Sequence, residues 1–287
     1  MMYPYYPGCS LHSTAREYDV SLKAVSDALG IELKEIKKWI CCGASAAHQT
    51  SPLLAISLPA KNLAEVEKES IDEVLVPCAA CYARFKTTKY ELENDPELLQ
   101  DIREIISYPF ENKVKILHPL EILSNGMSTK IKQNVKKDLS GLKVVCYYGC
   151  LLTRPPKVMQ FDTCEYPVSM DEILKNAGVE VLDWSYKTSC CGAALSLTKT
   201  EVILKLIDDI FENAKEVGAD AIAVACPLCH SNLDMRQDES NKSFNRDHTI
   251  PIMYFTQVLG LAFGLKPEDL SLNTHLVDTD VLLSKID

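Results

Sequence analysis

Ten of the twelve cysteines in this chain fall into two copies of one pattern. In each copy a single cysteine is followed by Cys-Cys-Gly and then by Cys-x-x-Cys. The first copy, here called the N-terminal cysteine set, consists of Cys9, Cys41, Cys42, Cys78 and Cys81. The second copy, the C-terminal cysteine set, consists of Cys150, Cys190, Cys191, Cys226 and Cys229. Five thiols gathered twice predict two metal centres of the iron–sulfur kind, and therefore redox chemistry.

The composition is that of a globular protein that works away from membranes and nucleic acids. The chain has 287 residues, of which 47% are apolar and 24% charged, and its net charge is −10. A negative charge disfavours nucleic-acid binding, which needs a positive surface. No apolar run is long enough for a membrane span, and the first residues lack the pattern of a signal peptide. We therefore expect a cytoplasmic protein that binds neither membrane nor nucleic acid.

Four uses for the cysteines compete. Structural disulfides are disfavoured because the cytosol keeps thiols reduced. A thioredoxin-like dithiol explains each Cys-x-x-Cys but leaves the adjacent cysteines without a role. Structural zinc takes four ligands in a tetrahedron, which adjacent cysteines serve poorly, although zinc in one half stays open. An iron–sulfur cluster suits adjacent cysteines best, because they can ligate different irons. Five thiols exceed the four of a cubane cluster, so either one is spare or the cluster is distorted.

The elements that position these cysteines also repeat. Residues 28–33 resemble residues 176–181, and residues 71–76 resemble residues 219–224. This favours a tandem duplication, with an N-terminal domain at 1–130, a C-terminal domain at 141–287 and a linker at 124–141. Strands are predicted at the segments 3–6, 74–76, 142–148 and 221–225, each ending next to a cysteine group.

Helical patterns follow these strands. Alternating strands and helices predict an α/β fold of two Rossmann-like halves, each a small parallel sheet flanked by helices. In such sheets, ligands gather at the carboxyl ends of the strands, where both cysteine sets should converge. Capping boxes at Thr14-x-x-Glu17, Ser169-x-x-Glu172 and Thr198-x-x-Glu201 predict where three of the helices start.

The duplicated arrangement resembles the cysteine-rich CCG domain, and nearly the whole chain resembles the B subunit of heterodisulfide reductase. The segments that carry this resemblance are residues 148–156, 187–193 and 225–233. The resemblance implies that each cysteine set holds one noncubane [4Fe-4S] cluster with all five thiols. It also implies cleavage of the mixed disulfide of coenzyme M and coenzyme B into two thiols, with the two clusters supplying one electron each.

An anionic disulfide would need cationic residues near the clusters. Arg154 and Lys187 are the catalytic candidates by position, and Arg84 and Arg236 are further cationic candidates. His230 follows Cys229 directly and is a candidate proton or hydrogen-bond donor. For each of these residues, the alternative is an ordinary ion pair or a packed side chain. His12 and His118 are interpreted as structural, Cys146 and Cys164 as non-ligands, and Trp39 and Trp184 as shields that keep water from the clusters.

The electrons must come from other proteins, because the sequence contains neither a nucleotide-binding fingerprint nor a ferredoxin run of cysteines. We therefore expect no flavin or nucleotide in this chain. The resemblance implies two partners in the same complex, a ferredoxin-like subunit and a flavin-containing subunit. Two alternatives stay open. The chain is an electron-transfer subunit of another CCG-domain oxidoreductase acting on succinate or fumarate, lactate or another disulfide, or it is a zinc-stabilised scaffold.

Overall fold

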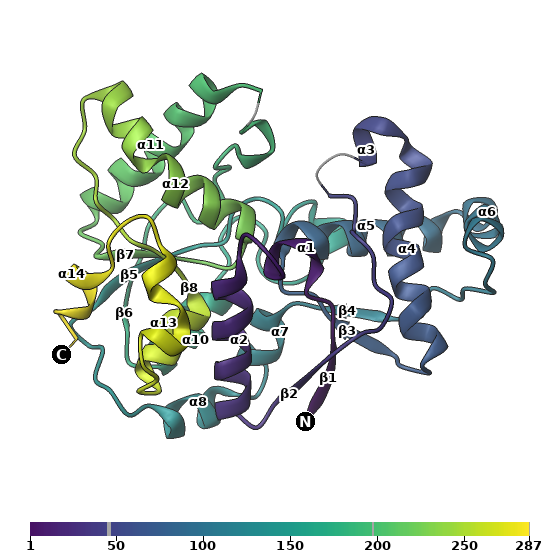
Figure 1. The fold of residues 1–287 in the computed structure, drawn as a ribbon, viewed down its shortest axis with the longest axis horizontal. Coiled ribbons are helices and arrows are strands. Elements are labelled where there is room, and N and C mark those ends of the chain that lie inside the picture. The colour runs from purple at the N-terminus through teal and green to yellow at the C-terminus, as the bar shows by residue number, and fades with distance from the viewer. Residues whose placement is uncertain (45–46, 197, 287) are drawn as a thin grey trace.

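The computed structural model describes residues 1–44, 47–196 and 198–286. It contains two similar halves, each built on a four-stranded sheet (Figure 1). All the strand pairs in both sheets are parallel. The strands of the first half are β1 (Met2–Tyr5), β2 (Glu32–Glu35), β3 (Glu73–Leu75) and β4 (Lys115–Leu117). Those of the second half are β5 (Lys143–Tyr147), β6 (Glu180–Leu182), β7 (Ala221–Val224) and β8 (Ile252–Tyr254).

The two sheets have the same topology, with strand order β2-β1-β3-β4 in the first half and β6-β5-β7-β8 in the second. This confirms the predicted α/β fold of two similar halves. In each half the three cysteine groups follow the first, second and third strands, which are neighbours in the sheet. The carboxyl ends of parallel strands share one edge of a sheet, so the topology gathers each cysteine set at that edge.

Helices cover the sheets. In the first half they are α1 (Gly8–Leu11), α2 (Arg16–Ala28), α3 (Ala47–Thr50), α4 (Pro52–Lys68), α5 (Ala79–Asn94), α6 (Pro96–Ile106), α7 (Pro119–Ser124) and α8 (Ser128–Asn134). In the second half they are α9 (Pro156–Met159), α10 (Ser169–Asn176), α11 (Thr200–Glu216), α12 (Pro227–Phe244), α13 (Phe255–Ala262) and α14 (Asp280–Leu283). Short 3₁₀ turns lie at Ala193–Leu195, Glu268–Leu270 and Leu272–Thr274.

The halves interlock. Helix α2 of the first half packs against α13 of the second, and α10 of the second packs against α7 of the first (Figure 1). Ser21 of α2 and Thr256 of α13 share a buried hydrogen bond of 2.7 Å between their hydroxyls. One continuous hydrophobic cluster runs through both halves. The segment 124–141, proposed as a linker, carries α8, which packs on α10. The proposed domain limits therefore mark sequence repeats that share one core.

The predicted capping boxes are wrong. The N-cap positions of α2, α10 and α11 are Ala15, Val168 and Lys199, and none of these residues makes a side-chain capping hydrogen bond. Ser169 is the first residue of α10, and its buried hydroxyl has no hydrogen-bond partner among the described residues. A capping box does form at α7, where His118 is the cap, and at α13 the side chain of Gln257 accepts from the backbone amide of Tyr254.

Candidate metal centres

Each cysteine set is assembled from three turns that follow parallel strands. The first turn places Cys9 in α1 and Cys150 shortly after β5, in each case behind a glycine with positive φ. The third turn places Cys78 and Cys226 at the N-cap positions of α5 and α12. Cys81 and Cys229 lie in the first turns of these helices.

The thiols of each set lie close together. The Sγ atoms of Cys42 and Cys81 are 2.9 Å apart, and those of Cys150 and Cys190 are 3.8 Å apart. All five cysteines of the C-terminal set line one small cavity of about 100 Å³. Three thiols of each set are buried, whereas the other two reach the surface. The accessible members are Cys9 and Cys41 in one set, and Cys150 and Cys190 in the other. A bound cluster would therefore be held by three buried thiols, and solvent could reach it on the side of the other two.

Contacts between the thiols favour thiolate at several positions. Hydrogen bonds from Cys41 and Cys81 lower the pKa of Cys42 to about 3. A hydrogen bond from Cys150 lowers the pKa of Cys190 to about 6. Hydrogen bonds from Cys229 lower the pKa values of Cys191 and Cys226 in the same way. The same hydrogen bonds raise the pKa values of the donor thiols, Cys41, Cys81, Cys150 and Cys229. Metal ions bind cysteine as thiolate, so binding a metal would release protons from these donors.

The backbone around the sulfurs also fits an iron–sulfur group. The amides of Gly43 and Gly192 donate to the Sγ atoms of Cys41 and Cys190, at 3.4 and 3.3 Å. Hydrogen bonds of this kind to ligand sulfurs are a feature of iron–sulfur sites. Ten thiols in two groups of five suit clusters with several irons better than single tetrahedral ions. The residues present therefore fit the predicted cofactor.

The two sets approach each other at the junction of the halves. The backbone of Ala80 in α5 lies near Cys226 of the opposite half and helps to lower the pKa of that thiol. Ala79, the first residue of α5, lines the cavity formed by the C-terminal set. The start of α5, which carries two cysteines of one set, is therefore part of the wall around the other set.

His118 links the starts of the two Cys-x-x-Cys turns. Its ring is completely buried. The Nδ1 atom accepts a hydrogen bond from the amide of Leu120 at 3.2 Å. The proton is therefore on Nε2, which donates to the carbonyl oxygen of Pro77 at 2.8 Å. The carbonyl of Ala225 also lies near the ring. Pro77 and Ala225 directly precede Cys78 and Cys226. Burial lowers the pKa of His118 to about 3, so the ring is a neutral structural bridge.

Replacing His118 by leucine should therefore destabilise the protein and loosen both turns. The carbonyl of Pro77 would lose its donor in a dry interior, which costs about 1–3 kcal/mol. Anaerobic urea unfolding measures this loss. His12→Leu is the control, because His12 is exposed and its ion pair is with Glu35 at the surface. Equal stability of the two variants would contradict the bridging role.

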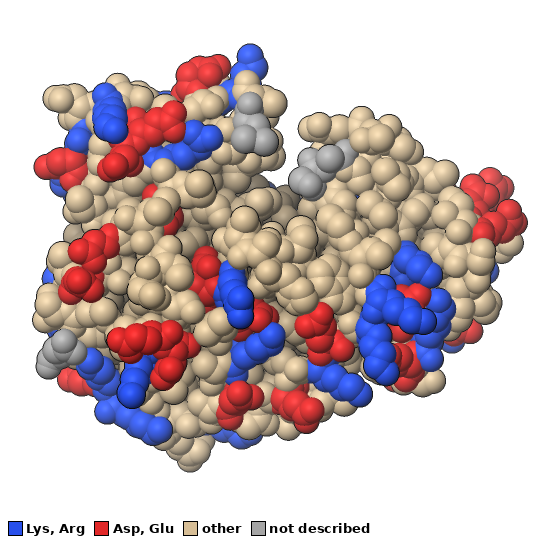
Figure 2. All heavy atoms as spheres, in the orientation of Figure 1, with Lys and Arg blue, Asp and Glu red and all other residues tan. Residues whose placement is uncertain are grey.

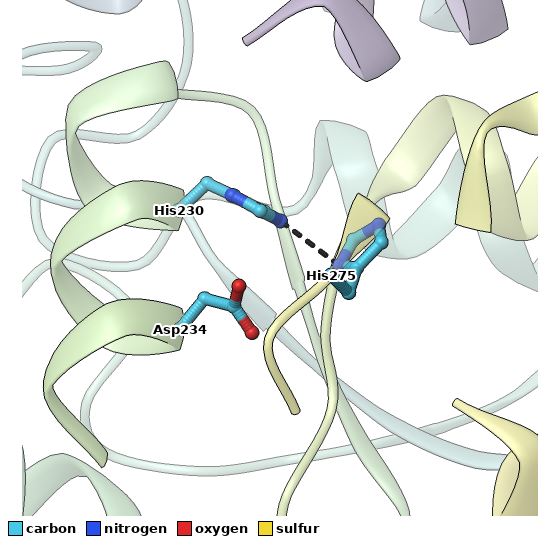
Figure 3. A group of neighbouring side chains, drawn as sticks. All are labelled: His230, Asp234 and His275. Atoms are coloured by element: carbon cyan, nitrogen blue, oxygen red, sulfur yellow. Dashed lines mark hydrogen bonds between the residues drawn. The ribbon is translucent and has the colours of Figure 1, made fainter. Parts of the chain in front are cut away.

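The ring of His230 points towards His275 (Figure 3). Its ring stacks on Tyr254 with centroids 4.4 Å apart, and its Nε2 lies 3.2 Å from Nδ1 of His275. Burial, and secondarily His275, lowers the pKa of His230 to about 3. The ring is neutral and turned towards the C-terminal segment. This geometry gives no support to proton donation to a substrate by His230.

His230, Asp234 and His275 place ligand atoms within 4.8 Å of one another, as a metal site would require. Their polar atoms are already satisfied. The carboxylate of Asp234 accepts hydrogen bonds from the backbone amides of Leu276 and Val277 at 2.9 and 3.1 Å. The side-chain amide nitrogen of Gln257 faces Nε2 of His275 at 2.8 Å, so that ring atom accepts and Nδ1 carries the proton towards His230. The bond between His230 and His275 and the two amide bonds to Asp234 fasten the C-terminal segment to α12.

Lys187 is buried in an ion pair. Its ammonium donates to Asp171 Oδ1 at 2.6 Å and to the carbonyl of Pro167 at 3.1 Å. The side chain is only 3% exposed and lies over the ring of Tyr166. The geometry favours a structural role for Lys187, away from a substrate.

The Lys187→Met variant tests this role. Removing one partner of a buried ion pair should lower the free energy of unfolding by about 3–5 kcal/mol, because a buried charge is left alone. The double variant Lys187→Met/Asp171→Leu should recover part of that loss. Anaerobic denaturant unfolding measures both. Unchanged stability together with a raised KM for an anionic disulfide would instead favour substrate contact.

The other cationic candidates also bond to protein groups. Arg154 pairs with Glu165 and donates to the hydroxyl of Thr188 at 3.2 Å. Arg236 pairs with Glu239 and donates to the carbonyl of Ser196 at 2.7 Å. Arg84 donates to the carbonyl of Ala55 at 3.0 Å.

Two further cysteines lie apart from the sets, with Cys146 buried in β5 and Cys164 hydrogen-bonded to Glu165.

Two tyrosines at the site were not singled out from the sequence. Tyr6 and Tyr147 each precede the first cysteine of a set by three residues, and both rings are buried beneath their set. The repeated Tyr-x-Gly-Cys sequence was the available signal. Trp39 and Trp184 contact these two rings edge-on.

Within the described ranges, no helix has the length and apolar character needed to cross a membrane.

The fold and the two thiol sites define a duplicated cysteine-rich α/β protein. The CCG family, described as a cysteine-rich domain, matches residues 3–86 and 144–234. The chain therefore belongs to the CCG family.

Relatives that carry a functional name are subunits of redox enzyme complexes. The chain is 30% identical over 283 residues to the 8-methylmenaquinol:fumarate reductase membrane anchor subunit of Wolinella succinogenes, covering 98% of both chains. It is 27% identical to the B subunit of the ferredoxin/F420H2-dependent CoB-CoM heterodisulfide reductase of Methanosarcina acetivorans, covering 97% of this chain and 95% of that protein. These relatives identify a CCG-domain subunit of an oxidoreductase.

A solved structure shares the fold. The crystal structure of a hypothetical protein from Helicobacter pylori matches with a TM-score of 0.74 at 13% identity. The match covers 96% of this chain and 52% of that one, so this chain spans about half of its length.

Proposed function

We propose that this chain is the disulfide-reducing subunit of a cytoplasmic iron–sulfur complex, in which each cysteine set holds one noncubane [4Fe-4S] cluster. The observation that carries the proposal is the meeting of the two sets at the junction of the halves. Ala79, which lies between Cys78 and Cys81 in the sequence, lines the cavity formed by the five cysteines of the C-terminal set. A disulfide in this region would have a redox centre from each half close to it.

The reaction consumes two electrons and two protons and converts one disulfide into two thiols. Bound clusters would supply the electrons one at a time. The residues of this chain hold the ligands, exclude water and orient the turns. The electrons would enter from partner proteins, for which we propose a ferredoxin-like subunit and a flavin-containing subunit of the same complex. The mixed disulfide of coenzyme M and coenzyme B is the proposed substrate, by analogy with the heterodisulfide reductase relatives.

A second candidate is electron exchange with an apolar reductant, as the name of the Wolinella relative suggests for that protein. Large apolar side chains lie beside ligands in both halves: Ile40, Leu151 and Leu228 are 39%, 37% and 38% exposed. Figure 2 shows a notch between the halves, and the visible part of its depth carries no Lys, Arg, Asp or Glu among the described residues. Such a surface favours an uncharged group over an anionic one.

Metal analysis of the anaerobically purified complex tests the cofactor. Two [4Fe-4S] clusters predict about eight irons and about eight acid-labile sulfides per chain. Zinc without iron would instead favour the scaffold alternative.

Turnover separates the two functions. The pre-reduced complex should be reoxidised by the coenzyme M–coenzyme B disulfide with release of two thiols. Reoxidation or reduction by a quinone or quinol, with no reaction of the disulfide, would favour the second candidate. In both assays, iron-free protein is the control.

A further inference from the structure

We propose that Tyr6 and Tyr147 are a matched pair of positioning residues, each of which fixes the Cys-Cys turn of its own half and raises the reduction potential of the cluster held there. The inference rests on the proposed iron–sulfur function. Neither tyrosine is a ligand, and each acts through the turn to which it is bonded.

The hydroxyl contact of the tyrosine is the same in both halves. The hydroxyl of Tyr6 donates to the carbonyl oxygen of Ile40 at 2.8 Å, and that of Tyr147 donates to the carbonyl oxygen of Ser189 at 2.5 Å. These two carbonyls belong to the residues directly before the adjacent cysteines, Cys41 and Cys190. Each phenol therefore ties the strand that carries the first cysteine to the turn that carries the second and third.

The groups beside each tyrosine ring are also stacked in the same order. A Cβ placed on Gly8 would lie 3.2 Å from Tyr6 Cε1 and 3.2 Å from Cys81 Sγ. A Cβ placed on Gly149 would lie 3.6 Å from Tyr147 Cε1 and 2.9 Å from Cys229 Sγ. In both halves the order is therefore tyrosine ring, bare glycine backbone and last cysteine of the set. A side chain at the glycine would separate the ring from the thiols.

Neither tyrosine ring is free to turn. Trp39 contacts Tyr6 edge-on with centroids 5.5 Å apart, and Trp184 contacts Tyr147 edge-on at 6.2 Å. The exposed fractions of Tyr6 and Tyr147 are 0% and 1%. The two tryptophans lie at different distances from their Cys-Cys pairs in the sequence, yet they reach equivalent places around the tyrosines. Two independently spaced residues that converge on the same contact indicate that the ring orientation matters.

The electrostatic consequence follows from the surroundings of each phenol. Four cysteines of the N-terminal set act on Tyr6 through their charges, and four of the C-terminal set act on Tyr147. Without the hydroxyl, the carbonyl before the Cys-Cys pair loses its donor beside the sulfurs. Additional negative charge on the cluster becomes less favourable, so the potential of that cluster should fall.

The experiment uses Tyr6→Phe, Tyr147→Phe and the double variant in the intact anaerobic complex. Reduction of the two centres is followed by redox titration monitored by electron paramagnetic resonance, with iron content measured in parallel. Each single variant should keep its iron and lower the potential of only one centre. The expected shift is up to about tenfold in the reduction equilibrium, or about 59 mV for a one-electron step. The double variant should shift both.

Tyr5→Phe and Tyr82→Phe are the matched controls. These two residues adjoin Tyr6 and Cys81 in the sequence, but their buried hydroxyls bond to Asp19 and Glu121 at 2.6 and 2.8 Å. Neither control should move a potential.

Full iron with unchanged potentials in both test variants would overturn the proposal. So would loss of iron in the test variants, since the tyrosines would then act only in assembly. A wild-type complex without iron would instead overturn the proposed function itself, which keeps the two failures distinct.

Discussion

Replacing Cys226 by alanine should remove the proposed cluster of the C-terminal half and leave the proposed cluster of the other half in place. Cys226 is buried at the N-cap of α12, and a hydrogen bond from Cys229 and the nearby backbone of Cys229, Leu228 and Ala80 lower the pKa of its thiol. No other described thiol occupies that position. We expect the iron content of the anaerobic protein to fall from about eight to about four per chain.

Two cysteines outside the sets provide controls for this prediction. Cys146→Ala changes a buried thiol, and Cys164→Ala changes a partly exposed one. Both variants should keep all their iron. Full iron in Cys226→Ala, or equal losses in the controls, would contradict the assignment of the C-terminal set as a cluster site.

The second large effect is expected at Gly149. Its φ is +68°, and a Cβ there would lie 2.9 Å from the sulfur of Cys229. Gly149→Ala should therefore lose the cluster of the C-terminal half, in addition to the strain of about 1–2 kcal/mol that a left-handed alanine costs. Iron analysis and thermal unfolding measure the two effects separately.

Gly178→Ala separates strain from collision. Gly178 has φ of +86°, but a Cβ there would have no described atom within 4 Å. This variant should lose similar stability from backbone strain and keep its iron. Iron loss in both variants would mean that strain alone disturbs the site.

The fold and the grouping of the cysteines could be predicted from the sequence because both depend on local signals. Strand patterns end at Gly8 and Gly149, whose positive φ turns the chain back at each strand end. A parallel sheet then gathers these turns at one edge. The structure places the predicted strands within one or two residues of their expected limits.

The roles of the charged candidates could not be predicted in the same way. Lys187 forms its ion pair with Asp171, sixteen residues earlier in the second half. The sequence suggested a role near the substrate only because Lys187 lies close to Cys190 in the chain. His118 acquires its bridging role because Ala225, far along the chain, approaches the same ring. The capping boxes failed for a related reason. Their motifs are local, whereas the starts of these helices are set by the packing around them.

The packing of helices from each half against helices of the other has a consequence for the evolutionary origin of this chain. Because α2 packs on α13 and α10 packs on α7, a single repeat would leave apolar helix faces uncovered. An ancestor with only one repeat would therefore have needed a second copy of itself, joined as a symmetric dimer, to fold. Gene fusion would have converted that dimer into one polypeptide. For the same reason, cutting the chain between the repeats should yield two fragments that are soluble only when they are together.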